Sequence, residues 1–404
     1  MIWTISWRNI WRNKKRSGIL LAAIASGLWA GLLTVGIFNG MVEQMVRSAI
    51  NTRTSHVQIH APGFVEHPDV VSTIPDGETV LARVRAADHV SSAVGRSVVP
   101  GMGSSATTGT AVVLRGIDVE AETGVSDVHS SIVEGSYFDT NGRNECVLGH
   151  KLAEKLNLTL GGKIIINAQA PDGSITGGAF RIVGIYRTVA TQFDKTAVFA
   201  RAADVDRTFE LGGEIHEIAL MADDIRTVPL LTKQLAASFP DLDVRSWDEL
   251  VPEIGMMTSM SQQMNSILMV IIMLALIFGI TNTMLMGVLE RIRELGVLMA
   301  LGMRPRSVFS MIVIETIALS ALGGTAGIAA GAVTITLLSK SGIDLSIVAT
   351  GLESFGMASR LYPSLAPAQY AMVAALVIAT AVVGSLYPGV KAARLQPMEA
   401  LRTY

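Results

Sequence analysis

The stretch that decides the fold is 264-MNSILMVIIMLALIFGITNTMLMGVL-289, which contains no charged side chain. It exceeds the roughly 18 apolar residues that indicate a membrane span. Three further runs, at about 17–42, 307–339 and 365–390, have the same character, and the second of these contains one charge, Glu315. As helices rising 1.5 Å per residue, all four can cross about 30 Å of hydrocarbon. Helices are predicted because they satisfy their own backbone hydrogen bonds in lipid.

Composition separates a membrane part from a water-exposed part. Of the 404 residues, 50% are hydrophobic and 16% are charged, whereas a soluble domain carries about 25% charged residues. Segment 43–263 holds 28 of the 34 acidic and 18 of the 32 basic residues. The predicted fold is therefore a membrane protein: four transmembrane α-helices with a large α+β extracytoplasmic (periplasmic) domain between the first two.

Alternating and helical patterns within 43–263 support the α+β class. Strands are predicted at 56–60, 110–118, 162–168 and 180–186, and helices at 149–158 and 228–239. A division of this domain near residue 125 is weakly marked. The first span is expected to continue outward as a helix beyond residue 42, and the second to begin before residue 264.

Basic residues predict the orientation. They cluster at the start of the chain, between the second and third spans, and at the end. Together these three segments contain 12 basic residues and three acidic ones. The positive-inside rule places these segments in the cytoplasm, and with them both termini. We expect an amphipathic helix at 1–16, with Trp3, Trp7 and Trp11 on one face, a cytoplasmic tail at 391–404 and a short external loop at 340–364. A cleaved signal peptide is the minor alternative.

The chain shows no catalytic motif. HExxH, GxSxG and CxxC are absent, and Gly161-Gly162-Lys163 lacks the frame of a nucleotide-binding loop. We therefore expect no enzyme activity, metal or cofactor in this chain. His56 and His60 are expected to be surface or edge histidines, too far apart along a strand to share a metal. The single cysteine, Cys146, excludes an intrachain disulfide and is expected to be buried as a small apolar residue.

The loop at 290–306 has an amphipathic pattern. Its apolar residues recur at three-residue spacing among charged ones, namely Ile292, Leu295, Leu298 and Leu301. The pattern predicts a short cytoplasmic helix ended by Gly302 and Pro305. Its apolar side is expected to cover lipid headgroups or a groove on a partner.

Two features inside the spans concern packing and charge. Small residues recur at helical spacing and predict close helix packing, within the chain or between subunits: Gly27, Gly31, Gly323, Gly324, Gly327 and Gly331. Glu315 is a candidate functional residue because an intramembrane carboxylate is costly. We favour its pairing with Arg304, Arg306 or a hydroxyl over a role in proton transfer.

The stretch 290–302, ERIRELGVLMALG, resembles the coupling loop of the FtsX/MacB/LolCE-type ABC transporter permeases. Segments 6–18, 314–331 and 387–402 resemble the family's N-terminus, third span and C-terminal signature, and 144–166 resembles its periplasmic core. The resemblance implies a type VII (mechanotransmission) architecture. It comprises two permease chains, identical or different, docked on a separate cytoplasmic ATPase dimer that binds ATP and Mg²⁺. The implied ATPase-coupling residues are Glu290, Arg291, Arg293, Glu294, Leu295, Gly296, Leu298, Leu301 and Gly302.

Segments 36–45 and 56–64 are similar to the lipoprotein-releasing LolC/LolE branch. This implies extraction of lipoproteins from the outer leaflet of the bacterial inner membrane for outer-membrane sorting. A periplasmic chaperone or adaptor is a candidate partner, and no nucleic acid is expected. MacB-like efflux of amphiphiles or peptides and FtsX-like regulation of a periplasmic enzyme remain alternatives.

Methionines at helical spacing suggest where cargo could lie. Met41, Met45, Met256, Met257, Met260 and Met264 either pack two helical extensions together or form an adaptable apolar wall. From their positions on the helices, the candidate cargo-contact residues are Phe38, Met41, Met45, Met264 and Leu268.

Overall fold

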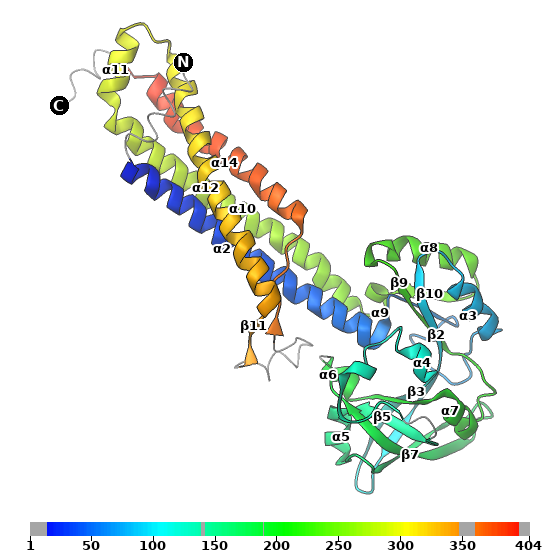
Figure 1. The fold of residues 1–404 in the computed structure, drawn as a ribbon. Coiled ribbons are helices and arrows are strands. Elements are labelled where there is room, and N and C mark those ends of the chain that lie inside the picture. Colours follow the sequence, from blue (N-terminus) through cyan, green and yellow to red (C-terminus); the bar gives the residue numbers. More distant parts are fainter. Residues whose placement is uncertain (1–13, 139–141, 189, 347–359, 396–404) are drawn as a thin grey trace. The chain divides into compact units, whose positions relative to one another are not determined.

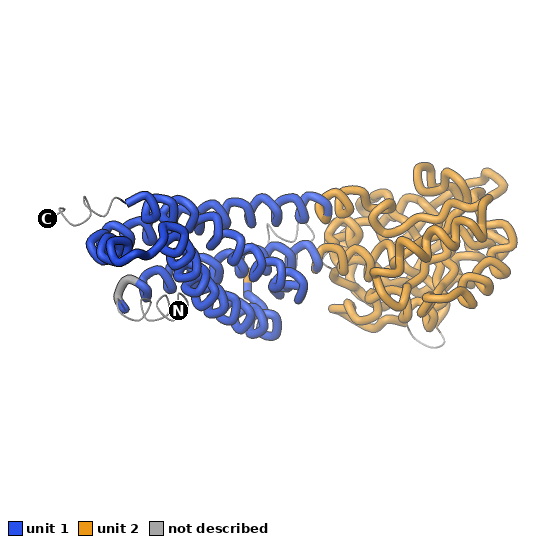
Figure 2. The backbone as a smooth tube through the Cα atoms, turned by 90° about the horizontal axis from the view of Figure 1, so that it is seen from above, with its two compact units in different colours: residues 1–43, 259–344, 360–404 blue, residues 44–258, 345–359 orange. Residues whose placement is uncertain are grey.

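The structure, a computed structural model, describes residues 14–138, 142–188, 190–346 and 360–395. The chain divides into two compact units (Figure 2). The membrane unit comprises residues 1–43, 259–344 and 360–404, and the inserted unit comprises 44–258 and 345–359. Most of the predicted helix at 1–16 and most of the tail at 391–404 lie outside the described residues.

Four long helices build the membrane unit. They are α2 (Lys14–Ala49), α10 (Pro252–Glu290), α12 (Pro305–Ser341) and α14 (Pro367–Ala393). All four are long and apolar enough to cross a membrane. They run alongside one another, with the short helix α11 (Ile292–Ala300) at one end (Figure 1). A small ladder pairs β11 (Ile343–Asp344) with β12 (Arg360–Leu361). The expected extensions are confirmed, since α2 continues to Ala49 and α10 begins at Pro252.

The glycines of α12 allow close contact with α2. A Cβ atom on Gly327 would lie 2.7 Å from the carbonyl oxygen of Ala25 and 2.9 Å from its Cα. Gly31 of α2 faces α10 in a similar way, because its Cβ would lie 2.5 Å from Cδ1 of Ile272. Small residues thus bring helices close enough for extensive dispersion contacts. These predicted seams are contacts within one chain.

The inserted unit contains, within the described residues, a ten-stranded sheet of order β10-β1-β9-β2-β3-β8-β5-β7-β4, with β6 paired to β2 and β7. The strands are β1 (Val57–His60), β2 (Val90–Ser104), β3 (Gly109–Ile117), β4 (Ile132–Gly135), β5 (Glu145–Gly149), β6 (Lys163–Gln169), β7 (Ile175–Tyr186), β8 (Ala197–Arg201), β9 (Glu217–Ala222) and β10 (Asp243–Ser246). The predicted α+β class is confirmed.

Helices cover this sheet and connect its strands. They are α3 (Gly77–Arg85), α4 (Val119–Glu122), α5 (His150–Leu156), α6 (Thr191–Asp194), α7 (Ala202–Phe209), α8 (Val228–Ser238) and α9 (Trp247–Leu250), with helical turns η1 (Ile50–Thr54), η2 (His129–Ser131) and η3 (Ile225–Thr227). The four predicted strands and the two predicted helices all correspond to observed elements.

Strand β2 joins two halves of the sheet. Its residues 90–96 pair with β9, and its residues 97–104 pair with β3. Each half has its own hydrophobic core. The expected division near residue 125 is therefore wrong. The change of partner falls between Arg96 and Ser97, inside a continuous strand where no turn or linker marks it.

The prediction for His60 is also wrong. Strand β1 lies between β9 and β10, and all four of its residues are buried. The His60 ring stacks on Phe64 with 5.3 Å between centroids, and its Nε2 lies 3.6 Å from Oε2 of Glu217. The sequence of a strand this short contains too few residues for its pattern to show that both faces are buried. Cys146 is fully buried, as expected, and burial raises the pKa of its thiol.

Candidate functional site

The candidate coupling site is α11 with its flanking residues. A single residue, Arg291, separates the end of α10 from the start of α11. Its φ of −107° and ψ of 17° depart from helical values, and its N–H donates to the carbonyl oxygen of Val288, three residues earlier, at 3.2 Å. The regular bonding of an α-helix is therefore interrupted at Arg291.

The far end of α11 closes with a Schellman motif. The N–H of Met303 donates to the carbonyl oxygen of Leu298, and that of Gly302 donates to Met299, both at 3.0 Å. Gly302 has a φ of 98°, which favours glycine, and Pro305 is the first residue of α12. The predicted helix end at Gly302 and Pro305 is confirmed.

The apolar stripe of α11 is divided between two surroundings. Leu295 is 4% exposed and belongs to the core of the membrane unit, and Gly296 is also buried. Leu301 is 80% exposed. The expectation that the whole stripe covers lipid or a partner is therefore wrong for Leu295, because that side chain packs against its own bundle.

The implied coupling residues consequently fall into two groups. Those exposed at the surface are Glu290, Arg293, Glu294, Leu301 and Gly302, and Val297, which the sequence did not single out, is exposed beside them. Those turned partly or wholly toward the membrane unit are Arg291, Leu295, Gly296 and Leu298. The first group can present a mixed apolar and charged surface, and the second can hold α11 in place.

Glu315 lies on α12 and is buried, with 7% exposure. Its Oε1 lies 3.3 Å from Nη1 of Arg291. The prediction named Arg304, Arg306 or a hydroxyl as partner and missed Arg291. Arg304 is eleven residues earlier, or about 16 Å along a helix axis. Folding α11 back onto the bundle brings Arg291 closer to Glu315 than the sequence suggests.

The candidate cargo residues differ in exposure. In the membrane unit, Met264 is 45% exposed, whereas Phe38, Met41 and Leu268 are half-buried. Met45 belongs to the inserted unit and is buried. The partly exposed side chain of Met264 leaves apolar surface on α10 at that position. The structure does not otherwise select these five residues.

An amide network that sequence reasoning missed links three helices of the membrane unit. Nδ2 of Asn265 on α10 donates to Oδ1 of Asn39 on α2 at 2.6 Å. Nδ2 of Asn39 donates to Oε1 of Gln369 on α14 at 3.3 Å, and the same oxygen accepts the N–H of Ala366 at 3.0 Å. The signal in the sequence that could have predicted this network is the presence of polar residues within the apolar runs.

A buried ion-pair network holds the centre of the inserted unit. Arg96 donates to Glu122 from Nε at 2.9 Å and from Nη2 at 2.6 Å, and to Glu217 from Nη1 at 2.5 Å. Burial alone would raise the pKa of Glu217, but Arg96 and His60 hold it well below its usual range. Arg96 is the last β2 residue paired with β9, so the network lies where the strand changes partner.

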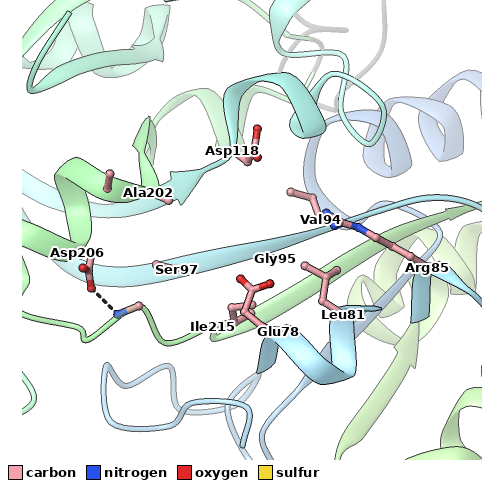
Figure 3. Close-up of a pocket in the computed structure, with 12 residues that line it drawn as sticks. Glu78, Leu81, Arg85, Val94, Gly95, Ser97, Asp118, Ala202, Asp206 and Ile215 are labelled. Carbon is pink, nitrogen blue, oxygen red and sulfur yellow. Dashed lines mark hydrogen bonds between the residues drawn. The ribbon is translucent and has the colours of Figure 1, made fainter. Parts of the chain in front are cut away.

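A polar cleft of about 370 Å³ lies in the inserted unit and is shown in Figure 3. Its charged lining residues are Glu78, Arg85, Asp118 and Asp206. Asp206 accepts the N–H of Gly213 at 2.7 Å, and Asp118 caps α4. These two carboxylates thus hold local backbone. Across the described ranges, no cluster of three or more His, Cys, Asp or Glu residues has metal-binding geometry.

Comparisons with known proteins match both parts of the chain. Residues 17–238 match the MacB-like periplasmic core domain, and residues 266–397 match the FtsX-like permease C-terminal domain. The lipoprotein-releasing system transmembrane protein LolC of Neisseria meningitidis serogroup B is 24% identical over 97% of this chain and 96% of that protein. The pyoverdine export ATP-binding/permease protein PvdT of Pseudomonas fluorescens is 26% identical over 98% of this chain and 58% of that protein.

Solved structures also match. The periplasmic region of MacB from Actinobacillus actinomycetemcomitans has a TM-score of 0.36 and 15% identity, covering 51% of this chain and 94% of that one. The extracellular domain of the noncanonic ABC-type transporter YknZ from Gram-positive bacteria has a TM-score of 0.33 and 15% identity, covering 47% and 99%.

Proposed function

Because the chain belongs to the family of ABC-type permeases that join a MacB-like periplasmic core domain to an FtsX-like C-terminal domain, we propose that it extracts lipoproteins from the membrane. In this proposal it takes them from the outer leaflet of the bacterial inner membrane, for sorting to the outer membrane. The observation that carries the choice of cargo is the match to 96% of LolC, through both units. PvdT is matched over 58% of its length.

The coupling end of the proposed machine is α11. A cytoplasmic ATPase dimer would bind ATP and Mg²⁺ and dock against the exposed residues of α11. Both chain termini would lie on this side, as the basic residues suggest. This chain would contribute a docking surface and no nucleotide-binding residue. A second permease chain, identical or different, would complete the complex.

The output of the proposed machine is motion of the inserted unit. Helix α10 has 39 residues, or about 58 Å, against about 30 Å of hydrocarbon. Helices α10 and α2 each include residues of the membrane unit and residues of the inserted unit, and neither helix is interrupted between them. A movement imposed at α11 would therefore reach the inserted unit through continuous helices. The exposed apolar side of α10 near Met264 would contact acyl chains.

Depletion in the native bacterium tests the cargo. We expect lipoproteins destined for the outer membrane to accumulate in the inner membrane, as measured by membrane fractionation. Purified complex should also release bound lipoprotein when ATP is added. Normal lipoprotein sorting after depletion would reject this function. Accumulation of a siderophore-like or other amphiphile instead would favour export, the activity named for PvdT.

Docking is tested with one apolar side chain. Leu301→Asp places a charge on the leucine that directly follows α11, which is 80% exposed, and should strongly reduce co-purification of the ATPase. Leu230→Asp is the matched control, since Leu230 is an exposed leucine on α8 of the inserted unit. Equal co-purification of the ATPase with both variants would mean that α11 is not the docking helix.

A further inference from the structure

We infer that Glu315 is a positioning residue that enforces the break between α10 and α11 and thereby orients the coupling helix. The break itself is seen in the structure, whereas its effect on coupling rests on the proposed function. The starting observation is that the break itself contains no proline or glycine, since Gly287 and Gly296 lie four and five residues away, inside α10 and α11. Residues 288–295 read VLERIREL, without proline or glycine.

Residues of this kind favour a continuous helix. Leu, Glu and Arg are among the better helix formers, and Val and Ile are only slightly worse. Sharp helix breaks usually occur at proline, at glycine or serine pairs, at π-bulges or where a side chain intrudes. Because Gly287 and Gly296 both lie within helices and neither occupies the break, we attribute the interruption at Arg291 to tertiary contacts.

Two contacts hold the residues just after the break. The Arg291 side chain contacts Glu315 at 3.3 Å, and the two side chains are 15% and 9% exposed. Leu295 follows Arg291 by four residues, so both lie on the same face of α11. Leu295 joins a buried cluster that also contains Met311 and Ile312, which lie one turn before Glu315 on α12.

The two contacts have different consequences. Burial of Leu295 is non-directional and would tolerate rotation or sliding of α11. The contact between Arg291 and Glu315 fixes the distance between the residue at the break and one point on α12. A carboxylate at this depth is stable only with a partner, so Glu315 draws Arg291 toward the bundle. The charge on α12 thus determines where α10 ends and which residues of α11 remain exposed.

The geometry can be tested without cargo or ATPase. Spin labels at Val297 on α11 and Val333 on α12, both exposed, would be placed in a Cys146→Ala background and their separation measured by pulsed EPR. Glu315→Gln should shift or broaden the distance distribution. The charge exchange Arg291→Glu with Glu315→Arg should restore it. Glu214→Gln, on an exposed carboxylate of the inserted unit, should leave it unchanged.

Coupling provides the second measurement. In the purified complex, Glu315→Gln should lower the ratio of cargo-stimulated to basal ATPase activity by roughly two- to thirty-fold, the range of single mutations that alter coupling. The charge exchange should recover most of this ratio. A merely structural loss of stability would lower basal and cargo-stimulated activity together and leave their ratio unchanged.

The outcomes separate this inference from the proposed function. An unchanged label distance in Glu315→Gln overturns the inference, as does failure of the charge exchange to restore it. If Glu315→Gln does not fold, Arg291→Gln removes the same contact through its more exposed residue, and its label distance is interpreted in the same way. A distance that responds as expected in a protein that does not move lipoproteins would leave the inference standing and reject the cargo.

Discussion

The interiors of the two units are held together by different kinds of contact. In the inserted unit, Arg96 contacts two buried carboxylates through three hydrogen bonds of 2.5–2.9 Å. In the membrane unit, the Arg291 and Glu315 side chains lie 3.3 Å apart beside a helix break, and glycines bring neighbouring helices together. Short, fully buried contacts resist rearrangement, whereas a longer and partly exposed contact beside a helix break can break and reform more readily. The comparison predicts that the core of the inserted unit is more resistant to substitution-induced rearrangement than the end of the helix bundle at Arg291.

The largest effect should come from the Arg96 network. Arg96→Met leaves Glu122 and Glu217 buried without their cation, and breaking a buried pair in this way costs about 3–5 kcal/mol. Denaturant unfolding of the full chain in detergent, with limited proteolysis of the inserted unit, measures the loss. Arg226→Met, which removes an exposed pair with Asp224, should leave stability unchanged. Equal destabilisation by both variants would contradict the comparison.

The buried carboxylate of Asp194, which lies 3.8 Å from Nδ1 of His150, should make the inserted unit sensitive to pH. Burial raises the pKa of Asp194 from 3.8 to about 6, against the hydrogen bonds from Thr188 that lower it. Because the folded state binds this proton more tightly, the contribution of Asp194 to stability is greatest below about pH 4 and falls as pH rises through about 6. The loss is on the order of 3 kcal/mol.

Asp194→Asn removes the titrating group and should flatten this part of the pH profile. Melting temperatures of the wild type and the variant between pH 4 and 7 provide the measurement. Taking the difference between the two proteins cancels the contributions of other groups. Parallel profiles would show that Asp194 is not the source of the sensitivity.

The glycine seam tests the membrane unit. Gly327→Ala places a methyl group against the backbone of Ala25, which cannot move aside as a side chain can. Overpacking of this kind costs about 1–3 kcal/mol, so the thermal stability in detergent should fall. Gly279→Ala is the matched control, because a Cβ there meets nothing within 4 Å. A stable Gly327→Ala variant would mean that the seam is looser than the inserted core.

The smallest effect should come from the amide network. Asn265→Leu removes a 2.6 Å hydrogen bond to Asn39, and such bonds between membrane helices contribute about 0.6–2 kcal/mol. A double-mutant cycle with Asn39→Leu isolates the coupling energy. Gln262→Leu, on an exposed residue of α10, should be close to neutral. Additive effects of the two Asn variants would show that the bond contributes nothing.

Sequence reasoning succeeded for the candidate site where local rules apply. The Schellman end at Gly302 and the proline start of α12 follow from backbone geometry alone, so the limits of α11 could be predicted. The orientation of its side chains could not. Leu295 and Leu301 are equivalent in the apolar pattern, but one is buried in the bundle and the other is exposed. Only the packing of α11 against α12 distinguishes them.

The sequence by itself determined that four helices cross the membrane and that a polar α+β domain is inserted between the first two. Lipid leaves a long apolar segment no other way to satisfy its backbone, so this conclusion needs no tertiary information. Tertiary structure alone decided that β2 changes partners after Arg96 and that α10 ends directly before Arg291. Both depend on contacts between residues 24 to 121 positions apart. Such pairs produce no periodic pattern in the sequence, because the two charges interact only when the fold brings them together.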